Sequence, residues 1–276
     1  MYPELFNIGP LTIYSYGMML AIGFIIASYV FTSELKRKRI DHNIGGNVTL
    51  LAVVFGIIGS KIHYLIEHSD KFIVDPSIAF SPGGLTFYGG LFLAFGVSYW
   101  YIKFRKKVNV LKAMDAIAPA LILGYGIARI GCHLAGDGDY GLPTELPWGT
   151  DYSRGTYPPS IAFLQLPDFA NQFPGGTVPD TTLLHPTPIY EFLATILIFA
   201  FLWRIRKRTT PDGALFMVYL TAAGLERFLI EFIRINPRLM LGLSEAQLIS
   251  VLVVGLGAYG ILHLRNRKEG KAEVTK

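Results

Sequence analysis

The chain has 276 residues, of which 51% are hydrophobic and only 16% charged, with a formal net charge of +5 at pH 7. This composition excludes an ordinary soluble domain and indicates a polytopic membrane protein. Apolar stretches able to cross about 30 Å of hydrocarbon must be helical, because lipid offers no partner to backbone groups. Seven occur, with the third and fifth near the short limit, at about 14–32, 46–66, 85–102, 113–131, 188–203, 213–233 and 246–264. We therefore predict an all-α membrane fold with seven transmembrane helices in a single domain, 1–276.

Cationic residues between these stretches indicate the direction of the chain. Clusters of lysine and arginine follow the first, third, fifth and seventh stretches, at 36–39, 103–112, 204–208 and 265–271. Cytoplasmic loops carry such an excess, so we expect the N-terminus outside and the C-terminus in the cytoplasm. Topology thus explains the positive charge, and no nucleic-acid partner is expected.

One connection, residues 132–187, is much longer than the others and rich in glycine, proline and aspartate. Loops of this length are usually functional, so we expect an extracytoplasmic cap with little regular structure. The first residues show no cationic region and no cleavage site, unlike a signal peptide. The single cysteine, Cys132, excludes an internal disulfide and gives no metal framework; no metal and no cofactor are expected.

Three cationic residues, Lys61, Arg129 and Arg227, lie within apolar stretches, all in the outward-facing half. Charge in lipid is costly and usually functional. Arg227 and Glu231 are spaced i,i+4, and Arg234 follows on the same face. Two guanidinium groups bind phosphate bidentately, so the pattern favours an anionic ligand such as a phospholipid headgroup. A structural Arg227–Glu231 pair and a Lys61 that extends to the interface are the alternatives.

Further single residues have simpler interpretations. Tyr14 fits an interfacial aromatic belt, and Asp115 fits the start of the fourth helix. Cys132 fits a small packing residue, and His133 fits a loop histidine whose ring is satisfied.

Five short motifs occur in order along the chain. They are Tyr16-Gly17; Gly83-Gly84 through Gly89-Gly90; Ala128-Arg129-Ile130-Gly131 with Gly136-Asp137; His185-Pro186 with Tyr190-Glu191; and Arg227-Phe228 with Glu231-Phe232 and Arg234. With these motifs and this topology, nearly the whole chain resembles the bacterial prolipoprotein diacylglyceryl transferase family. The resemblance implies transfer of diacylglyceryl from phosphatidylglycerol to a cysteine thiol in a lipoprotein-precursor signal peptide, releasing glycerol phosphate. It places the reaction at the outer leaflet of the bacterial inner membrane, with the lipid bilayer as surroundings.

The resemblance also implies roles for residues. Arg129 and Arg227 would hold the phosphate and stabilise its developing charge, and Glu231 would orient an arginine. Tyr16 would donate a hydrogen bond to the headgroup, and Asp137 would bind glycerol hydroxyls or orient an arginine. The expected catalytic residues are Arg129, Arg227, Tyr88, Asp137 and His133. The expected substrate-binding residues are Tyr16, Lys61, Gly89, Gly90, Gly141, His185, Tyr190, Glu191, Glu231 and Arg234.

The chain departs from the family pattern at two places. Tyr88 stands where the family commonly has a histidine, proposed as general base, and a tyrosine base needs cationic help, for example from Lys61. Cys132 replaces an asparagine, and residues 136–141 contain one extra residue. These changes leave open another acceptor, proton transfer by His133 or Asp137, and a non-catalytic phospholipid-binding member. A lipid or anion transporter is disfavoured, because the inner half offers little polar beyond Asp115.

Overall fold

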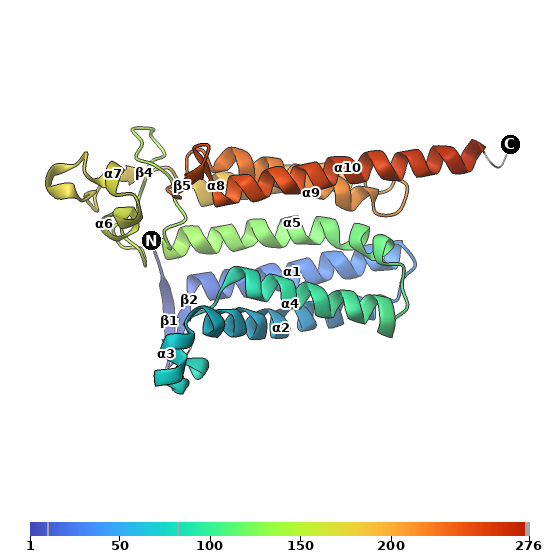
Figure 1. The fold of residues 1–276 in the computed structure, drawn as a ribbon, viewed down its shortest axis with the longest axis horizontal. Coiled ribbons are helices and arrows are strands. Elements are labelled where there is room, and N and C mark those ends of the chain that lie inside the picture. The colour runs from blue at the N-terminus through green and yellow to red at the C-terminus, as the bar shows by residue number, and fades with distance from the viewer. Residues whose placement is uncertain (10, 82, 274–276) are drawn as a thin grey trace. The chain divides into compact units, whose positions relative to one another are not determined.

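The computed structural model describes residues 1–9, 11–81 and 83–273, and this part of the chain is mostly helical (Figure 1). The helices are α1 (Ser15–Arg37), α2 (Asn43–Glu67), α3 (Ser69–Val74), η1 (Pro76–Phe80), α4 (Phe87–Trp100), η2 (Tyr101–Arg105), α5 (Val110–Ala135), α6 (Pro159–Ala162), η3 (Phe163–Gln165), α7 (Pro167–Ala170), η4 (Pro174–Gly176), α8 (Thr187–Ile205), α9 (Ala214–Ile230) and α10 (Glu245–Glu273). The strands are β1 (Glu4–Ile8), β2 (Leu11–Tyr14), β3 (Thr150–Asp151), β4 (Leu183–Leu184), β5 (Arg238–Met240) and β6 (Leu243–Ser244). They form three antiparallel pairs, β1–β2, β3–β4 and β5–β6, which the all-α expectation omitted.

Each of the seven apolar stretches contains a helix, and five of these helices are long and apolar enough to cross a membrane. These five are α1, α2, α5, α8 and the Glu245–Asn266 part of α10. The other two are shorter: α4 has 14 residues and runs into the π-helix η2, and α9 has 17. Seven crossings therefore remain a prediction, while a mostly helical chain with several helices long and apolar enough to cross a membrane is confirmed.

The chain divides into two compact units. Unit 1 contains Met1–Ala27 and Ile117–Lys276, and unit 2 contains Ser28–Ala116. The helices α1 and α5 each belong partly to both units.

In unit 1, α9 packs against both α8 and α10 (Figure 1). Three buried side chains, Ile122 of α5, Leu202 of α8 and Leu215 of α9, form a common apolar core. Glycines bring backbones close: a Cβ on Gly126 would meet the Thr195 side chain of α8. Small residues at such contacts allow helices to approach closely in lipid, so α5, α8 and α9 form one bundle.

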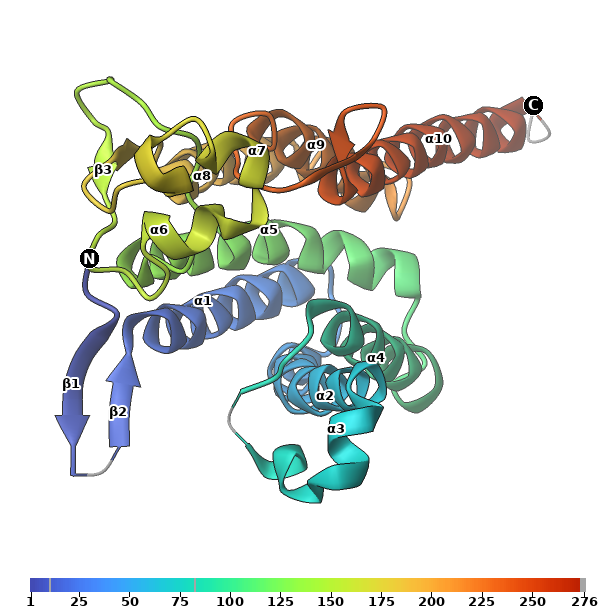
Figure 2. The ribbon, with the colours of Figure 1, turned by 60° about the vertical axis from the view of Figure 1, so that its left-hand side comes forward.

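The long connection of unit 1 has only short regular elements but an apolar core of its own. It contains the short helices α6 and α7 (Figure 2) and the strands β3 and β4. Its own apolar core includes Tyr140, Tyr152, Phe163 and Val178, and it also takes in Ile235 from beyond α9. The regular elements between 136 and 186 are short, as expected, and aromatic side chains spread along the segment give it an apolar core of its own.

In unit 2, α2 and α4 pack closely through glycines (Figure 2). A Cβ on either Gly59 or Gly89 would collide with the carbonyl group of the other. The start of α5 is capped by Asn109, whose Oδ1 accepts a hydrogen bond from the Leu111 amide at 3.0 Å. The sequence suggested that Asp115 starts this helix, but it does not. Asp115 is buried and pairs with Lys38 Nζ at 2.9 Å.

Candidate functional site

Charged side chains from three helices of unit 1, and from the segments that follow α5 and α9, meet where α5 ends, α8 begins and α9 ends. We call six of them the arginine cluster: Arg129, Arg227, Arg234, Asp139, Glu191 and Glu231. Every member makes at least one ion pair with another member. The cluster thus contains three guanidinium groups and three carboxylates in contact.

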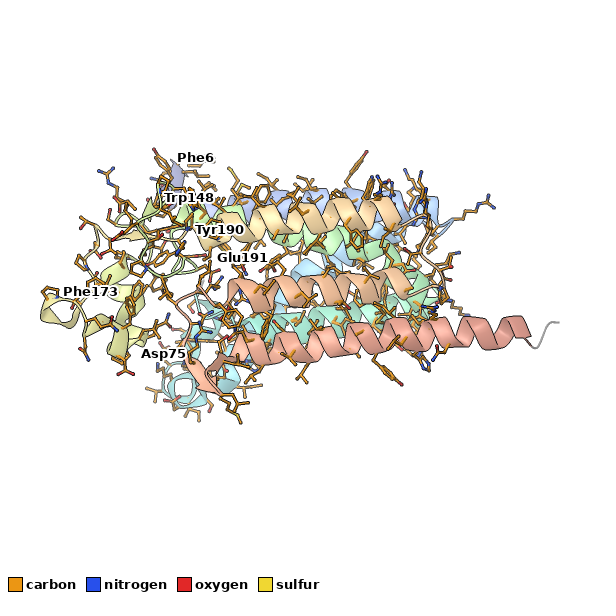
Figure 3. The ribbon with its side chains drawn as sticks, turned by 90° about the horizontal axis from the view of Figure 1, so that it is seen from above. Phe6, Asp75, Trp148, Phe173, Tyr190 and Glu191 are labelled. Carbon is orange, nitrogen blue, oxygen red and sulfur yellow. The ribbon has the colours of Figure 1, made fainter. Side chains whose placement is uncertain are left out.

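Glu191 is the centre of the cluster and is fully buried near the N-terminal end of α8 (Figure 3). Its carboxylate lies 3.5 Å from Arg129 Nε, 3.0 Å from Arg227 Nη1 and 3.2 Å from Arg234 Nη1. The Tyr125 hydroxyl also donates to it, at 2.8 Å. One carboxylate therefore fixes the orientation of all three guanidinium groups.

Glu231 is a second buried anchor. Its Oε2 lies 3.0 Å from Arg227 Nη2, so the two Nη atoms of Arg227 face two different carboxylates. Its Oε1 accepts hydrogen bonds from Asn236 Nδ2 and from Ser244 Oγ. The i,i+4 pairing of Arg227 with Glu231 is confirmed, and Glu231 restrains an arginine as the sequence suggested.

The loop after α5 supplies the third carboxylate. Asp139 pairs with both Arg129 and Arg234, whereas Asp137 accepts from the Asp139 amide at 3.3 Å. Gly136 and Gly138 have positive φ angles, +59° and +88°, which shape this turn. Burial alone would raise the pKa of Asp139, but Arg234 and Arg129 outweigh it and hold that pKa well below its usual range. Burial, reinforced by the charge of Asp139, raises the pKa of Asp137 to about 6.

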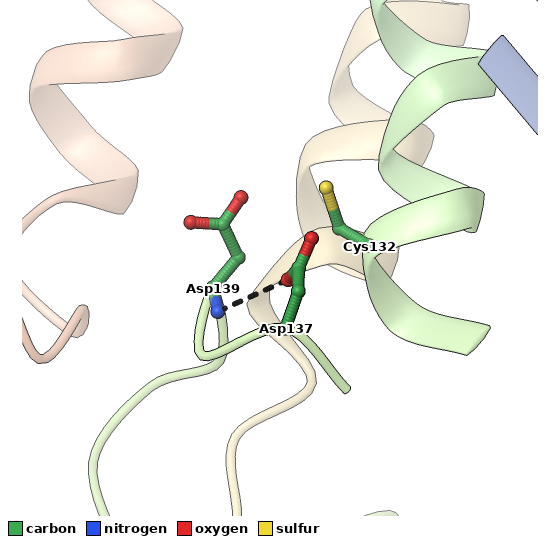
Figure 4. A group of neighbouring side chains, drawn as sticks. All are labelled: Cys132, Asp137 and Asp139. Carbon is green, nitrogen blue, oxygen red and sulfur yellow. Dashed lines mark hydrogen bonds between the residues drawn. The ribbon is translucent and has the colours of Figure 1, made fainter. Parts of the chain in front are cut away.

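Cys132 lies beside this loop (Figure 4). One ligand atom from each of Cys132, Asp137 and Asp139 falls within 4.8 Å of the others. These are metal-ligand types, but Arg129 Nη1 is 3.6 Å from Cys132 Sγ and two arginines pair with Asp139. Because two arginines already pair with Asp139, this group of three is poorly suited to hold a metal ion.

Gly141 proves to be a close-packing position. Its amide donates to the His185 carbonyl at 2.9 Å, and it forms a bridge with Arg234. A Cβ there would meet the Ile233 carbonyl and the Thr187 side chain. The glycine therefore allows the cap segment to pass beside the arginine cluster.

Three other predicted residues connect parts of the cap. His133 Nδ1 lies 2.9 Å from the Tyr152 hydroxyl. His185 Nδ1 lies 3.2 Å from the Tyr190 hydroxyl, which also accepts from Trp148 Nε1 at 2.7 Å (Figure 3). Each of these polar side chains thus has a hydrogen-bond partner within the protein.

Tyr16, in the first turn of α1, is 42% exposed, and its backbone lies against Gly131. Its side chain is thus available to a ligand, unlike the buried carboxylates of the cluster.

Four of the predicted site residues, Lys61, Tyr88, Gly89 and Gly90, lie in unit 2. Lys61 Nζ donates to the carbonyls of Ser81 and Gly83 at 2.9 and 2.8 Å, so it restrains the connection before α4. Tyr88, in the first turn of α4, is 38% exposed. The two glycines serve the packing of α4 on α2.

The sequence reading missed several members of this network. Tyr125 precedes Arg129 by one helical turn, and its ring centroid lies 4.7 Å from the guanidinium, so the i,i+4 spacing was a usable signal. Asp139 was visible as the second aspartate of the loop, but spacing cannot say which of two loop carboxylates faces an arginine. Asn236 and Ser244 gave no signal, because they reach Glu231 from outside any helix.

Comparisons with known proteins agree with these motifs. The family model described as prolipoprotein diacylglyceryl transferase matches residues 3–263. The phosphatidylglycerol–prolipoprotein diacylglyceryl transferase of Clostridium tetani is 31% identical over 271 residues, covering 98% of this chain and 100% of the relative. Transferase 2 of Clostridium perfringens is 31% identical over 265 residues, covering 94% of each chain. The enzyme of Dehalococcoides mccartyi (strain ATCC BAA-2266 / KCTC 15142 / 195) is 28% identical over 274 residues, covering 98% and 96%.

Proposed function

Because the chain belongs to the prolipoprotein diacylglyceryl transferase family, we propose that it transfers diacylglyceryl from phosphatidylglycerol to a lipoprotein-precursor thiol. The acceptor is a cysteine in the signal peptide of the precursor, and glycerol phosphate is released. The observation that carries this proposal is the convergence of Arg129, Arg227 and Arg234 on shared carboxylates at the ends of α5, α8 and α9. Guanidinium groups held in fixed orientations are suited to bind a phosphate diester.

The reaction makes one bond and breaks one. The thiol loses its proton, its sulfur attacks the diacylglyceryl carbon that bears the phosphate, and the bond between that carbon and the phosphate oxygen breaks. The phosphate leaves with the bonding electrons, so negative charge develops on its oxygen. Arg129 and Arg227 stabilise this charge, and because Glu191 and Glu231 already orient them, little reorganisation is needed.

Proton transfer is assigned to Asp137, Tyr88 or His133. A pKa near 6 suits Asp137 to exchange a proton close to neutral pH, which makes it the first residue to test. Tyr16, Lys61, His185 and Tyr190 are proposed to contact substrate, and Gly89, Gly90 and Gly141 to belong to the same substrate-binding set through the backbone packing that they allow.

We further propose seven transmembrane helices in one domain, with the N-terminus outside, the C-terminus in the cytoplasm and 132–187 as an extracytoplasmic cap. The location is the bacterial inner membrane, with the site toward the outer leaflet. The clusters of lysine and arginine after alternate helices support this orientation. A reporter enzyme active only in the periplasm tests it: fused to the C-terminus it should be inactive, and activity there would refute the orientation.

The function is tested with purified protein, phosphatidylglycerol vesicles and a precursor peptide, by the mass of the peptide. We expect a diacylglyceryl mass gain with the wild type, its loss in Arg129→Ala and Arg227→Ala, and its retention in Arg154→Ala, which removes an exposed cap arginine. Lipid binding without any mass gain would favour a non-catalytic phospholipid-binding protein. Full activity of both cluster variants would reject the site.

A further inference from the structure

Three buried side-chain atoms lack a hydrogen-bond partner within the described part of the chain: Glu226 Oε1, Glu231 Oε2 and Arg234 Nε. All three belong to the arginine cluster or its immediate surroundings. Two of these atoms, Glu231 Oε2 and Arg234 Nε, have an oppositely charged group nearby but no hydrogen bond of suitable geometry. Glu231 Oε2 lies 3.0 Å from Arg227 Nη2 and 3.7 Å from Arg234 Nε. Buried polar groups are normally hydrogen-bonded, so this concentration at one place indicates a polar ligand.

Glu226 is the member of this group that the mechanism does not use. It directly precedes Arg227 in α9, and the charged groups around it are Glu191, Arg227, Arg129 and Arg234. The three guanidinium groups of the cluster are already matched by its three carboxylates. Neutralisation of an arginine therefore does not explain why Glu226 lies here.

A hydroxyl group is the ligand that suits this carboxyl oxygen. Hydroxyls both donate and accept, so they pair with a carboxyl in either protonation form, whereas a phosphate oxygen is repelled by a carboxylate. The phosphate thus belongs to the guanidinium groups and a hydroxyl to Glu226. A glycerol phosphate headgroup carries both on one small group.

We propose that Glu226 binds a glycerol hydroxyl of the lipid headgroup and selects phosphatidylglycerol over phospholipids of equal charge that lack the hydroxyl. This inference rests on the proposed function and names the residue that determines donor specificity. A donor without the hydroxyl would leave a buried carboxyl oxygen unpaired, and sites of this kind reject such analogues. For one hydrogen bond to a carboxyl group we expect roughly 10- to 100-fold discrimination.

The test compares two lipid donors, phosphatidylglycerol and phosphatidylpropanol, which have the same charge and the same number of headgroup carbons. The ratio of kcat/KM for the two donors is measured with a precursor peptide. We expect the wild type to prefer phosphatidylglycerol, Glu226→Leu to lose the preference, and Glu226→Gln to keep most of it through its amide oxygen. The matched control Glu145→Gln changes an exposed cap residue and should keep the wild-type ratio.

A second measurement needs only the wild type: inhibition by glycerol phosphate should be about tenfold stronger than inhibition by propyl phosphate. Equal inhibition by the two phosphates, or an unchanged donor ratio in Glu226→Leu, would overturn the inference. The proposed function would still stand as long as the wild type transferred diacylglyceryl from phosphatidylglycerol. If the wild type transferred from neither donor, the proposed function itself would fail. If Glu226→Leu did not fold, equal inhibition by the two phosphates would still overturn the inference, and the donor ratio of Glu226→Gln would still test the residue.

Discussion

Glu191→Gln should destabilise the protein far more than its small chemical change suggests. The substitution keeps shape and removes one charge, which leaves Arg129, Arg227 and Arg234 facing two carboxylates instead of three. Removing one partner of a buried ion pair costs about 3–5 kcal/mol, because the remaining charge loses its compensation. For a chain of this size that corresponds to a fall in Tm of roughly 6–20 °C.

The single cysteine provides the assay. Cys132 is only 6% exposed, so a thiol-reactive fluorophore in detergent solution should label it when the protein unfolds. We expect Glu145→Gln, an exposed change of the same type, to melt with the wild type. If Glu191→Gln melted within about 2 °C of the wild type, Glu191 would not hold the arginines together, and the proposed arrangement of the arginine cluster around Glu191 would be refuted.

Three further predictions concern single positions. Arg227→Lys keeps the charge, but a lysine has one nitrogen and cannot contact Glu191 and Glu231 with two, so kcat/KM should fall roughly 10- to 100-fold. The exposed control Arg204→Lys should keep wild-type activity. Equal activity of the two variants would contradict the role of the two guanidinium nitrogens. Gly141→Ala adds a Cβ against the Ile233 carbonyl and should cost about 1–3 kcal/mol in the melting assay, whereas Gly255→Ala, which meets open space, should not. The pKa of Asp137 is raised from 3.8 to about 6 on folding, so its stabilising contribution is complete below about pH 4 and is lost as the pH rises through 6. The Tm of the wild type should therefore fall over this pH range, and Asp137→Asn should remove that fall. An unchanged Tm–pH curve in the variant would refute the raised pKa of Asp137.

Hydropathy located the helices because lipid leaves the chain no alternative to internal hydrogen bonding. It was less informative at the ends. The residues of strand β1 do not alternate between apolar and polar, and the strand is exposed along its whole length. Its sequence pattern therefore did not distinguish a strand from an irregular N-terminal segment. The helix α9 ends at Ile230, three residues before the apolar stretch does, and the side chain of the next residue, Glu231, pairs with Arg227 in the cluster.

Spacing along a helix reports only neighbours on that helix, and this limit explains what the sequence revealed about the site. The pair Arg227–Glu231 was visible at i,i+4, and the structure confirms it. The pair Arg227–Glu191 joins residues 36 positions apart, and no periodicity connects α9 to the N-terminal part of α8. Yet the second contact determines what the site can do, because it gives Arg227 two anchors and brings it to the carboxylate that also holds Arg129. The chemistry therefore depends on the junction of three helices, and each motif alone looks like an ordinary ion pair until the helices are brought together.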